Sequence, residues 1–139
     1  MKSIATLLRV KQRELDVLKR QQAVLENQKA EVVKRIDRLT QQLLDEMKTA
    51  EAMPEMAHFF GDFSATIKVR QAALRSQTDK IDAELERVAV QILDRFSELK
   101  KYEIALANWK KRKADEMNRR SQQYMDEVAI RGYIRRDAT

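Results

Sequence analysis

The amino-acid sequence predicts an all-α protein, a long antiparallel two-helix coiled-coil hairpin whose C-terminal helix overhangs the first. Three observations favour this fold. The 139 residues include only two glycines and one proline, too few for the turns of an all-β or α/β fold. Charged residues make up 36% of the chain, which is typical of long helices. Apolar residues recur at alternating spacings of three and four, in two runs separated by one breaker region. We expect residues 1–139 to form a single domain.

The first helix is expected over about residues 3–53. Its apolar stripe repeats about every 3.5 residues, which is the coiled-coil pattern, and we call such a stripe a seam. Pro54 should end or kink the helix, because proline lacks the amide hydrogen and its ring clashes with the preceding turn. The first seam comprises Ile4, Leu8, Lys11, Leu15, Leu18, Gln22, Leu25, Lys29, Val32, Ile36, Leu39, Leu43, Glu46, Ala50 and Met53.

A turn is expected at about residues 54–63, followed by a second helix over about residues 64–130. Asp62 and Ser64 are candidate N-caps, because their side-chain oxygens can accept hydrogen bonds from the first helical amides. The second seam comprises Ile67, Gln71, Leu74, Thr78, Ile81, Leu85, Val88, Ile92, Arg95, Leu99, Tyr102, Leu106 and Trp109.

The two seams can be paired by matching residues whose numbers sum to 113 or 114. The apolar pairs then include Met53 with Phe60, Ala50 with Phe63, Leu39 with Leu74, Val32 with Ile81, Leu25 with Val88 and Ile4 with Trp109. Each polar seam residue faces an apolar one: Lys11 with Tyr102, Gln22 with Ile92, Lys29 with Leu85, Glu46 with Ile67, Gln71 with Leu43 and Arg95 with Leu18. Long basic side chains can cover a seam while their charge reaches water. A register slipped by one heptad remains compatible with the pattern.

In this register the first helix ends opposite Trp109, and the residues after it have no partner within the chain. The candidate partner-binding residues of this segment are Trp109, Lys110, Lys111, Arg112, Lys113, Arg119 and Arg120. A weaker apolar stripe accompanies them at Ala114, Met117, Ser121, Tyr124 and Val128. The helix is expected to stop near Gly132, which leaves residues 131–139 as a frayed tail.

Three interpretations of this basic segment remain open. It can be a solvated, charged helix, or the docking end for an acidic or ring-shaped protein partner, because a long unpaired helix gains order from what it binds. It can also bind nucleic acid, but a basic leucine zipper places its basic region before the zipper, whereas here it follows the seam. Acidic residues also interrupt the run, at Asp115, Glu116, Asp126 and Glu127.

Three of the four phenylalanines, Phe59, Phe60 and Phe63, gather at the expected turn with Met53 and Met56. Such a cluster can close the end of the hairpin, and part of it can also serve as an exposed contact site for a partner.

The sequence contains no recognisable catalytic or cofactor-binding pattern. It has no nucleophile paired with a base and no glycine-rich phosphate loop. His58 is the only histidine and there is no cysteine, so neither a metal site nor a disulfide is expected. We therefore expect a protein that is not an enzyme and that carries no cofactor.

The net charge of +6 favours acidic partners. No apolar run approaches the length of a membrane span, and the N-terminal apolar stretch, which Arg9 and Lys11 interrupt, is too short for a signal peptide.

The segment "YEIALANWKKRKADEMNRRSQQYMDEVAIRGY", residues 102–133, resembles the C-terminal region of the flagellar FliJ family of type III export proteins. The short basic N-terminus, the chain length and the position of the breaker are also similar to that family. The ending "DEVAIRGY" and the Tyr–Trp–basic stretch are its most distinctive parts.

This resemblance implies an antiparallel helical hairpin, similar to the two-helix stalk of the ATP synthase γ subunit. It also implies a role in flagellum biogenesis, and so in motility and chemotaxis. The protein would be cytoplasmic and peripherally associated with the inner membrane. Its partners would be the ring ATPase of the export apparatus, held by the open end of the hairpin, the cytoplasmic domain of the export gate, and export chaperones that it escorts. We expect the gate contact on the tip-side half, near Leu39–Ala50 and Ile67–Arg75.

Two alternatives belong to other classes: a basic nucleic-acid-binding coiled coil, and a purely structural homodimer of extended chains. The favoured prediction is a monomeric hairpin that binds proteins and no nucleic acid.

Overall fold

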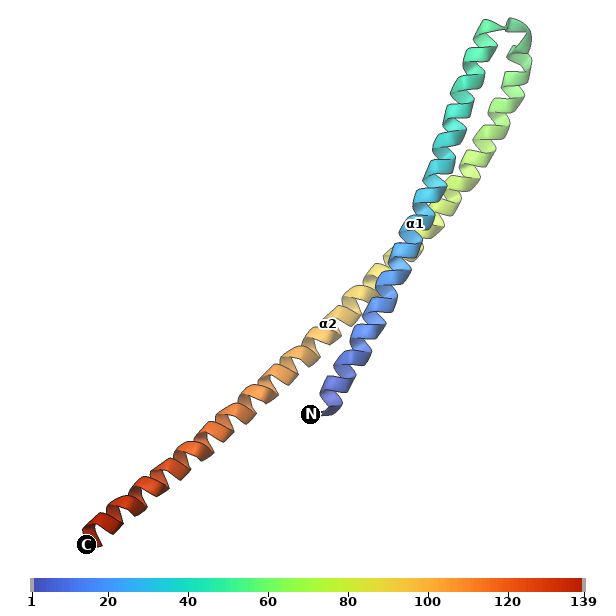
Figure 1. Cartoon of the computed structure of the whole chain (residues 1–139). Coiled ribbons are helices and arrows are strands. Elements are labelled where there is room, and N and C mark those ends of the chain that lie inside the picture. Colours follow the sequence, from blue (N-terminus) through green and yellow to red (C-terminus); the bar gives the residue numbers. More distant parts are fainter. Residues whose placement is uncertain (1, 139) are drawn as a thin grey trace. The chain divides into compact units, whose positions relative to one another are not determined.

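The computed structural model describes residues 2–138, and this part of the chain is helical with no strand. Helix α1 spans Lys2–Ala52, a short 3-10 turn (η1) spans Pro54–Met56, and helix α2 spans Ala57–Ala138. The two long helices pack against each other, so the predicted all-α hairpin is confirmed (Figure 1).

The chain divides into two compact units. The tip unit is Arg13–Arg95, which contains most of α1, the turn and the first half of α2. The terminal unit combines Met1–Gln12 with Phe96–Thr139.

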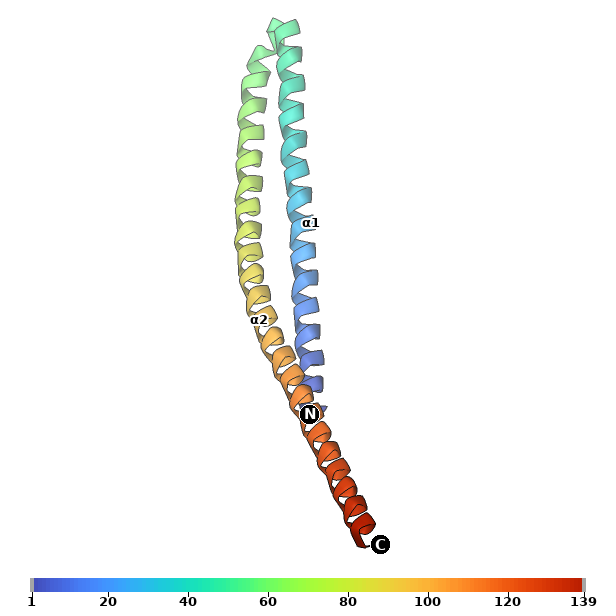
Figure 2. The same cartoon turned by 90° about the vertical axis from the view of Figure 1, so that its left-hand side faces the viewer.

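In the tip unit, α1 and α2 run antiparallel and side by side, and the turn joins them (Figures 1 and 2). The core is a single file of seam residues, because two helices can bury side chains only along their line of contact. Its buried members are Leu15, Val32, Ile67, Gln71, Ile81 and Val88. All six belong to the seams predicted from the sequence.

The pairing of the tip unit follows the predicted register. Side chains expected to face each other line common hollows: Leu39 with Leu74, Val32 with Ile81, and Ala50 with Phe63. A slip of one heptad would move each partner by about 10 Å along the helix axis, at about 1.5 Å per residue. The shared hollows therefore support the predicted register for this unit.

Polar seam residues of the tip unit find polar partners just beside the seam. The buried side chain of Gln71, 7% exposed, donates from Nε2 to Oγ1 of Thr40 at 2.8 Å. Lys29 Nζ lies 2.7 Å from Oδ1 of Asp82, and Arg95 Nε lies 3.7 Å from Oε2 of Glu14. The aliphatic parts of these side chains thus cover the seam, while their polar ends bind polar side chains at its edge.

The connection between the helices is shorter than predicted. Met53 is extended, with φ −129° and ψ 90°, and Pro54 begins the 3-10 turn. Proline fits this first position because an amide hydrogen there would have no hydrogen-bond acceptor within the turn. Because α2 begins at Ala57, Asp62 and Ser64 lie inside the helix, and the predicted N-caps and the turn at 54–63 are wrong. Gly61 is another helical residue near the start of α2. Its φ is not positive, and a helix tolerates glycine at a cost of about 1 kcal/mol.

In the terminal unit, the N-terminal part of α1 lies beside α2. Lys11 Nζ approaches Oε2 of Glu98 at 3.1 Å, and Leu99 is buried. The half-buried residues here include Ile4, Leu8, Tyr102, Leu106 and Trp109, as the predicted register requires.

Helix α2 continues beyond the N-terminal end of α1 (Figure 1). All residues from 110 to 137, which follow Trp109, are exposed. The predicted overhang is present, and we use that name for residues 110–138. The predicted stop near Gly132 and the frayed tail at 131–139 are wrong for the described residues, because α2 runs to Ala138. Arg135 and Arg136 occupy the last turn, where positive charge interacts favourably with the helix dipole.

Candidate functional site

The overhang presents its charged side chains to solvent along a single helix. The predicted cations Lys110, Lys111, Arg112, Lys113, Arg119 and Arg120 are all exposed, whereas Trp109 is half-buried. These residues lie close together because they are near one another in sequence, on successive turns of α2.

Two of these cations already have partners within the helix. Arg120 donates to Oε1 of Glu116 at 2.8 Å, and Lys113 Nζ lies 4.9 Å from the centroid of the Trp109 ring, a cation–π contact. The four others have no ion-pair partner among residues 2–138: Lys110, Lys111, Arg112 and Arg119. These four are the cations free to meet an acidic partner.

The shifted apolar stripe of the overhang is also exposed. Met117, Tyr124 and Val128 all lie open to solvent and return to one side of the helix at spacings of seven and four. An exposed apolar stripe on a charged helix is a surface that a partner can cover.

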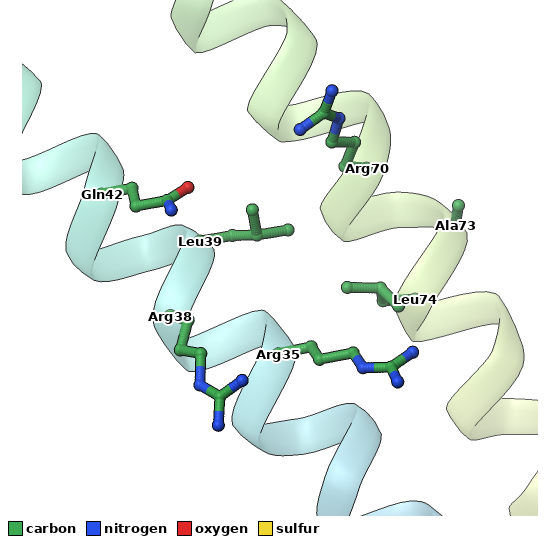
Figure 3. A pocket seen from close by; sticks show the side chains of 7 residues that line it. All are labelled: Arg35, Arg38, Leu39, Gln42, Arg70, Ala73 and Leu74. Carbon is green, nitrogen blue, oxygen red and sulfur yellow. The ribbon is translucent and has the colours of Figure 1, made fainter.

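A second candidate surface lies between the helices of the tip unit. It is a groove of about 440 Å³, lined by Arg35, Arg38, Leu39, Gln42, Arg70, Ala73 and Leu74. Figure 3 shows Leu39 and Leu74 pointing toward each other from the two helices, with Arg35 extending toward α2. The three arginines have no ion-pair partner among the described residues. The groove is therefore apolar at its floor and positively charged at its rim.

The region expected from the sequence for a partner contact, near Leu39–Ala50 and Ile67–Arg75, includes Arg70 but misses Arg35 and Arg38, although a signal for them was present. Arg35 lies one turn before Leu39, and Arg70 lies one turn before Leu74. Since those two leucines face each other, the flanking arginines come from both helices to one place.

The aromatic cluster at the turn is only partly buried. Phe60 and Phe63 are half-buried, whereas Phe59 is 63% exposed and meets the His58 ring edge-on at a centroid distance of 6.0 Å. Closure of the hairpin end thus accounts for Phe60 and Phe63 but not for Phe59.

Within residues 2–138, neither helix contains a stretch long and apolar enough to span a membrane. No group of three or more histidine or carboxylate side chains in the same residues is placed to hold a metal ion.

The chain matches a known protein family. The family model described as "Flagellar FliJ protein" matches residues 1–138. No curated protein and no solved structure gives a significant match to the chain.

Proposed function

Because the chain belongs to the flagellar FliJ protein family and is thus a component of the flagellar protein export apparatus, we propose that it acts there as a non-enzymatic, stalk-like adaptor. In this role the overhang binds the ring ATPase, the groove binds the cytoplasmic domain of the export gate, and the protein escorts export chaperones. It works in the cytoplasm, peripherally at the inner membrane.

One observation carries the ATPase contact. The packing of α1 against α2 ends near Trp109, while α2 continues to Ala138 with an exposed apolar stripe and five unpartnered cations, Lys110, Lys111, Arg112, Arg119 and Arg131. A helix with so little intramolecular support gains stability from a partner that covers it. Unpaired cations favour an acidic docking surface.

The ATPase contact is tested by reversing four of these unpartnered cations, Lys110, Lys111, Arg112 and Arg119, to glutamate. The matched control reverses four exposed cations elsewhere, Lys19, Arg20, Lys48 and Lys80, so both variants have the same net charge. Pull-down with the purified export ATPase should fail for the overhang variant and succeed for the control. Circular dichroism should give equal helicity. ATPase binding that survives the overhang reversal would refute the assignment.

The groove supports the gate contact, because it overlaps the region expected for that partner, through Leu39, Gln42, Arg70, Ala73 and Leu74, and offers unpaired arginines around two leucines. A variant with Arg35→Glu, Arg38→Glu and Arg70→Glu should no longer bind the purified gate domain and should still bind the ATPase. The overhang variant should behave in the opposite way. Loss of both partners from either variant would contradict two separate sites.

The same variants address the nucleic-acid alternative. Binding of duplex DNA in 50 mM salt that disappears with the overhang reversal, together with unchanged ATPase binding, would assign the basic segment to nucleic acid.

A further inference from the structure

The tip of the hairpin carries an apolar surface that closing the turn does not use. A hollow of about 280 Å³ is lined by Glu46, Thr49, Ala50, Met56, Phe59, Phe60 and Phe63. Met53 is 58% exposed and Met56 is 43% exposed, in addition to the exposed ring of Phe59. We call Met53, Met56 and the three phenylalanines the tip cluster. The hollow is too small for a typical ligand pocket and is of a size to accept an apolar side chain from a partner.

The charge around the tip cluster is opposite to that of the chain as a whole. Residues 45–62 contain five carboxylates and one lysine, whereas the whole chain carries a net charge of +6. All five are exposed and have no ion-pair partner among the described residues, and Asp45 accepts a hydrogen bond from Gln41; the other four are Glu46, Glu51, Glu55 and Asp62. The tip is therefore a negatively charged, apolar surface on a basic protein.

This combination selects one kind of occupant. Unpaired carboxylates repel nucleic acid and anionic lipid and attract lysine and arginine. The unbranched thioether of methionine adapts to different apolar partners, and phenylalanine supplies a large contact area. An amphipathic helix with apolar residues on one face and basic residues beside them matches both properties.

We propose that the tip cluster binds a basic amphipathic helical segment of a partner protein, with an apolar side chain of that segment in the hollow. This contact is additional to the ATPase and gate contacts, and it uses neither the overhang nor the groove.

The test uses the full chain and a fluorescent synthetic peptide of leucine and lysine at heptad spacing, with a leucine–glutamate peptide as the charge control. Fluorescence anisotropy should detect the basic peptide and not the acidic one. The variant Met56→Ser with Phe59→Ser should bind the basic peptide with an affinity lower by roughly tenfold or more. The matched control, Leu93→Ser with Phe96→Ser, removes a similarly exposed pair from α2 outside the overhang and should change affinity by less than about twofold.

The charge requirement is tested separately with Glu46→Gln, Glu51→Gln and Glu55→Gln, against Glu26→Gln, Glu86→Gln and Asp94→Asn as a matched control. Only the three substitutions at the tip should lower the affinity for the basic peptide. Added salt should lower the affinity of the wild-type protein for the same peptide.

Equal affinity for basic and acidic peptides, or affinity unaffected by the tip variants, would overturn the proposal. Concentration-dependent self-association in light scattering that the tip variant abolishes would assign the surface to a second copy and also overturn it. Because both tip variants keep the overhang intact, ATPase binding by these variants reports on the proposed function independently.

Discussion

Val69 lies two residues after Ile67 in α2, but the two side chains have opposite environments. Ile67 is 1% exposed within the seam, whereas Val69 is 71% exposed. In a two-helix structure only the residues on the line of contact are removed from water, so each buried residue carries a large share of the stability.

Replacing Ile67 by alanine should therefore lower the free energy of unfolding by about 2–4 kcal/mol, because it removes buried methyl groups and leaves a cavity. Val69→Ala is the matched control and should change it by less than about 0.5 kcal/mol. Urea unfolding followed by circular dichroism measures both. Similar losses in the two variants would contradict the assignment of Ile67 to the core.

Gln71 shows how a polar residue is accommodated in the seam. Its amide donates to Thr40, so Thr40→Val should cost about 1 kcal/mol of stability by leaving that buried donor without its acceptor. The same change should cost less than about 0.5 kcal/mol in a Gln71→Leu background, where there is no donor to satisfy. Urea titrations of all four chains measure this coupling, and equal costs in both backgrounds would show that the hydrogen bond contributes nothing.

At the scale of the element, Met53 and the turn that begins at Pro54 determine where the chain passes from α1 to α2, and neither glycine contributes to this connection. Neither glycine has a positive φ, and a Cβ at Gly61 or at Gly132 would meet nothing within 4 Å. Both are ordinary helical positions that lack a side chain.

Gly61→Ala should accordingly stabilise the protein by about 0.5–1 kcal/mol, because alanine loses less backbone entropy in a helix. Thermal unfolding should give a higher midpoint than for the wild type. Gly61→Pro is the opposing control and should destabilise by about 3 kcal/mol, since it would break α2 inside its second turn. Destabilisation by alanine would mean that the helix does not begin at Ala57.

At the scale of the whole molecule, the fold back of one chain on itself is the property that separates a monomeric hairpin from a dimer of extended chains. The register places Leu25 opposite Val88 in the tip unit, so cysteines at these two positions should form a disulfide within one chain. Non-reducing electrophoresis after oxidation of a dilute sample measures this outcome. The control pair, Leu25→Cys with Ile81→Cys, is displaced by one heptad and should form no intramolecular bridge. Disulfide-linked dimers from the first pair would favour the homodimer.

The sequence by itself determined the all-α class and the two seams, because a heptad pattern with a single breaker leaves few ways to bury its apolar residues. It favoured one pairing of the seams but left a slip of one heptad open. It also indicated the overhang, since the paired seam ends at Trp109 while the helical sequence continues. It did not determine where α2 begins or ends, because Gly61, Asp62 and Gly132 are locally compatible with either a helix or a stop, and continuation of the helix decided each case.

The surfaces between helices were decided by the tertiary structure alone. Arg35 and Arg70 lie far apart in the chain and share a groove only because the hairpin places Leu39 against Leu74. The division of the tip cluster into half-buried Phe60 and Phe63 and exposed Phe59 likewise depends on the four-residue connection, which sets the rotation of α2 as it leaves the turn. Local pattern fixes which residues face the partner helix, and only packing fixes which side chains remain outside it.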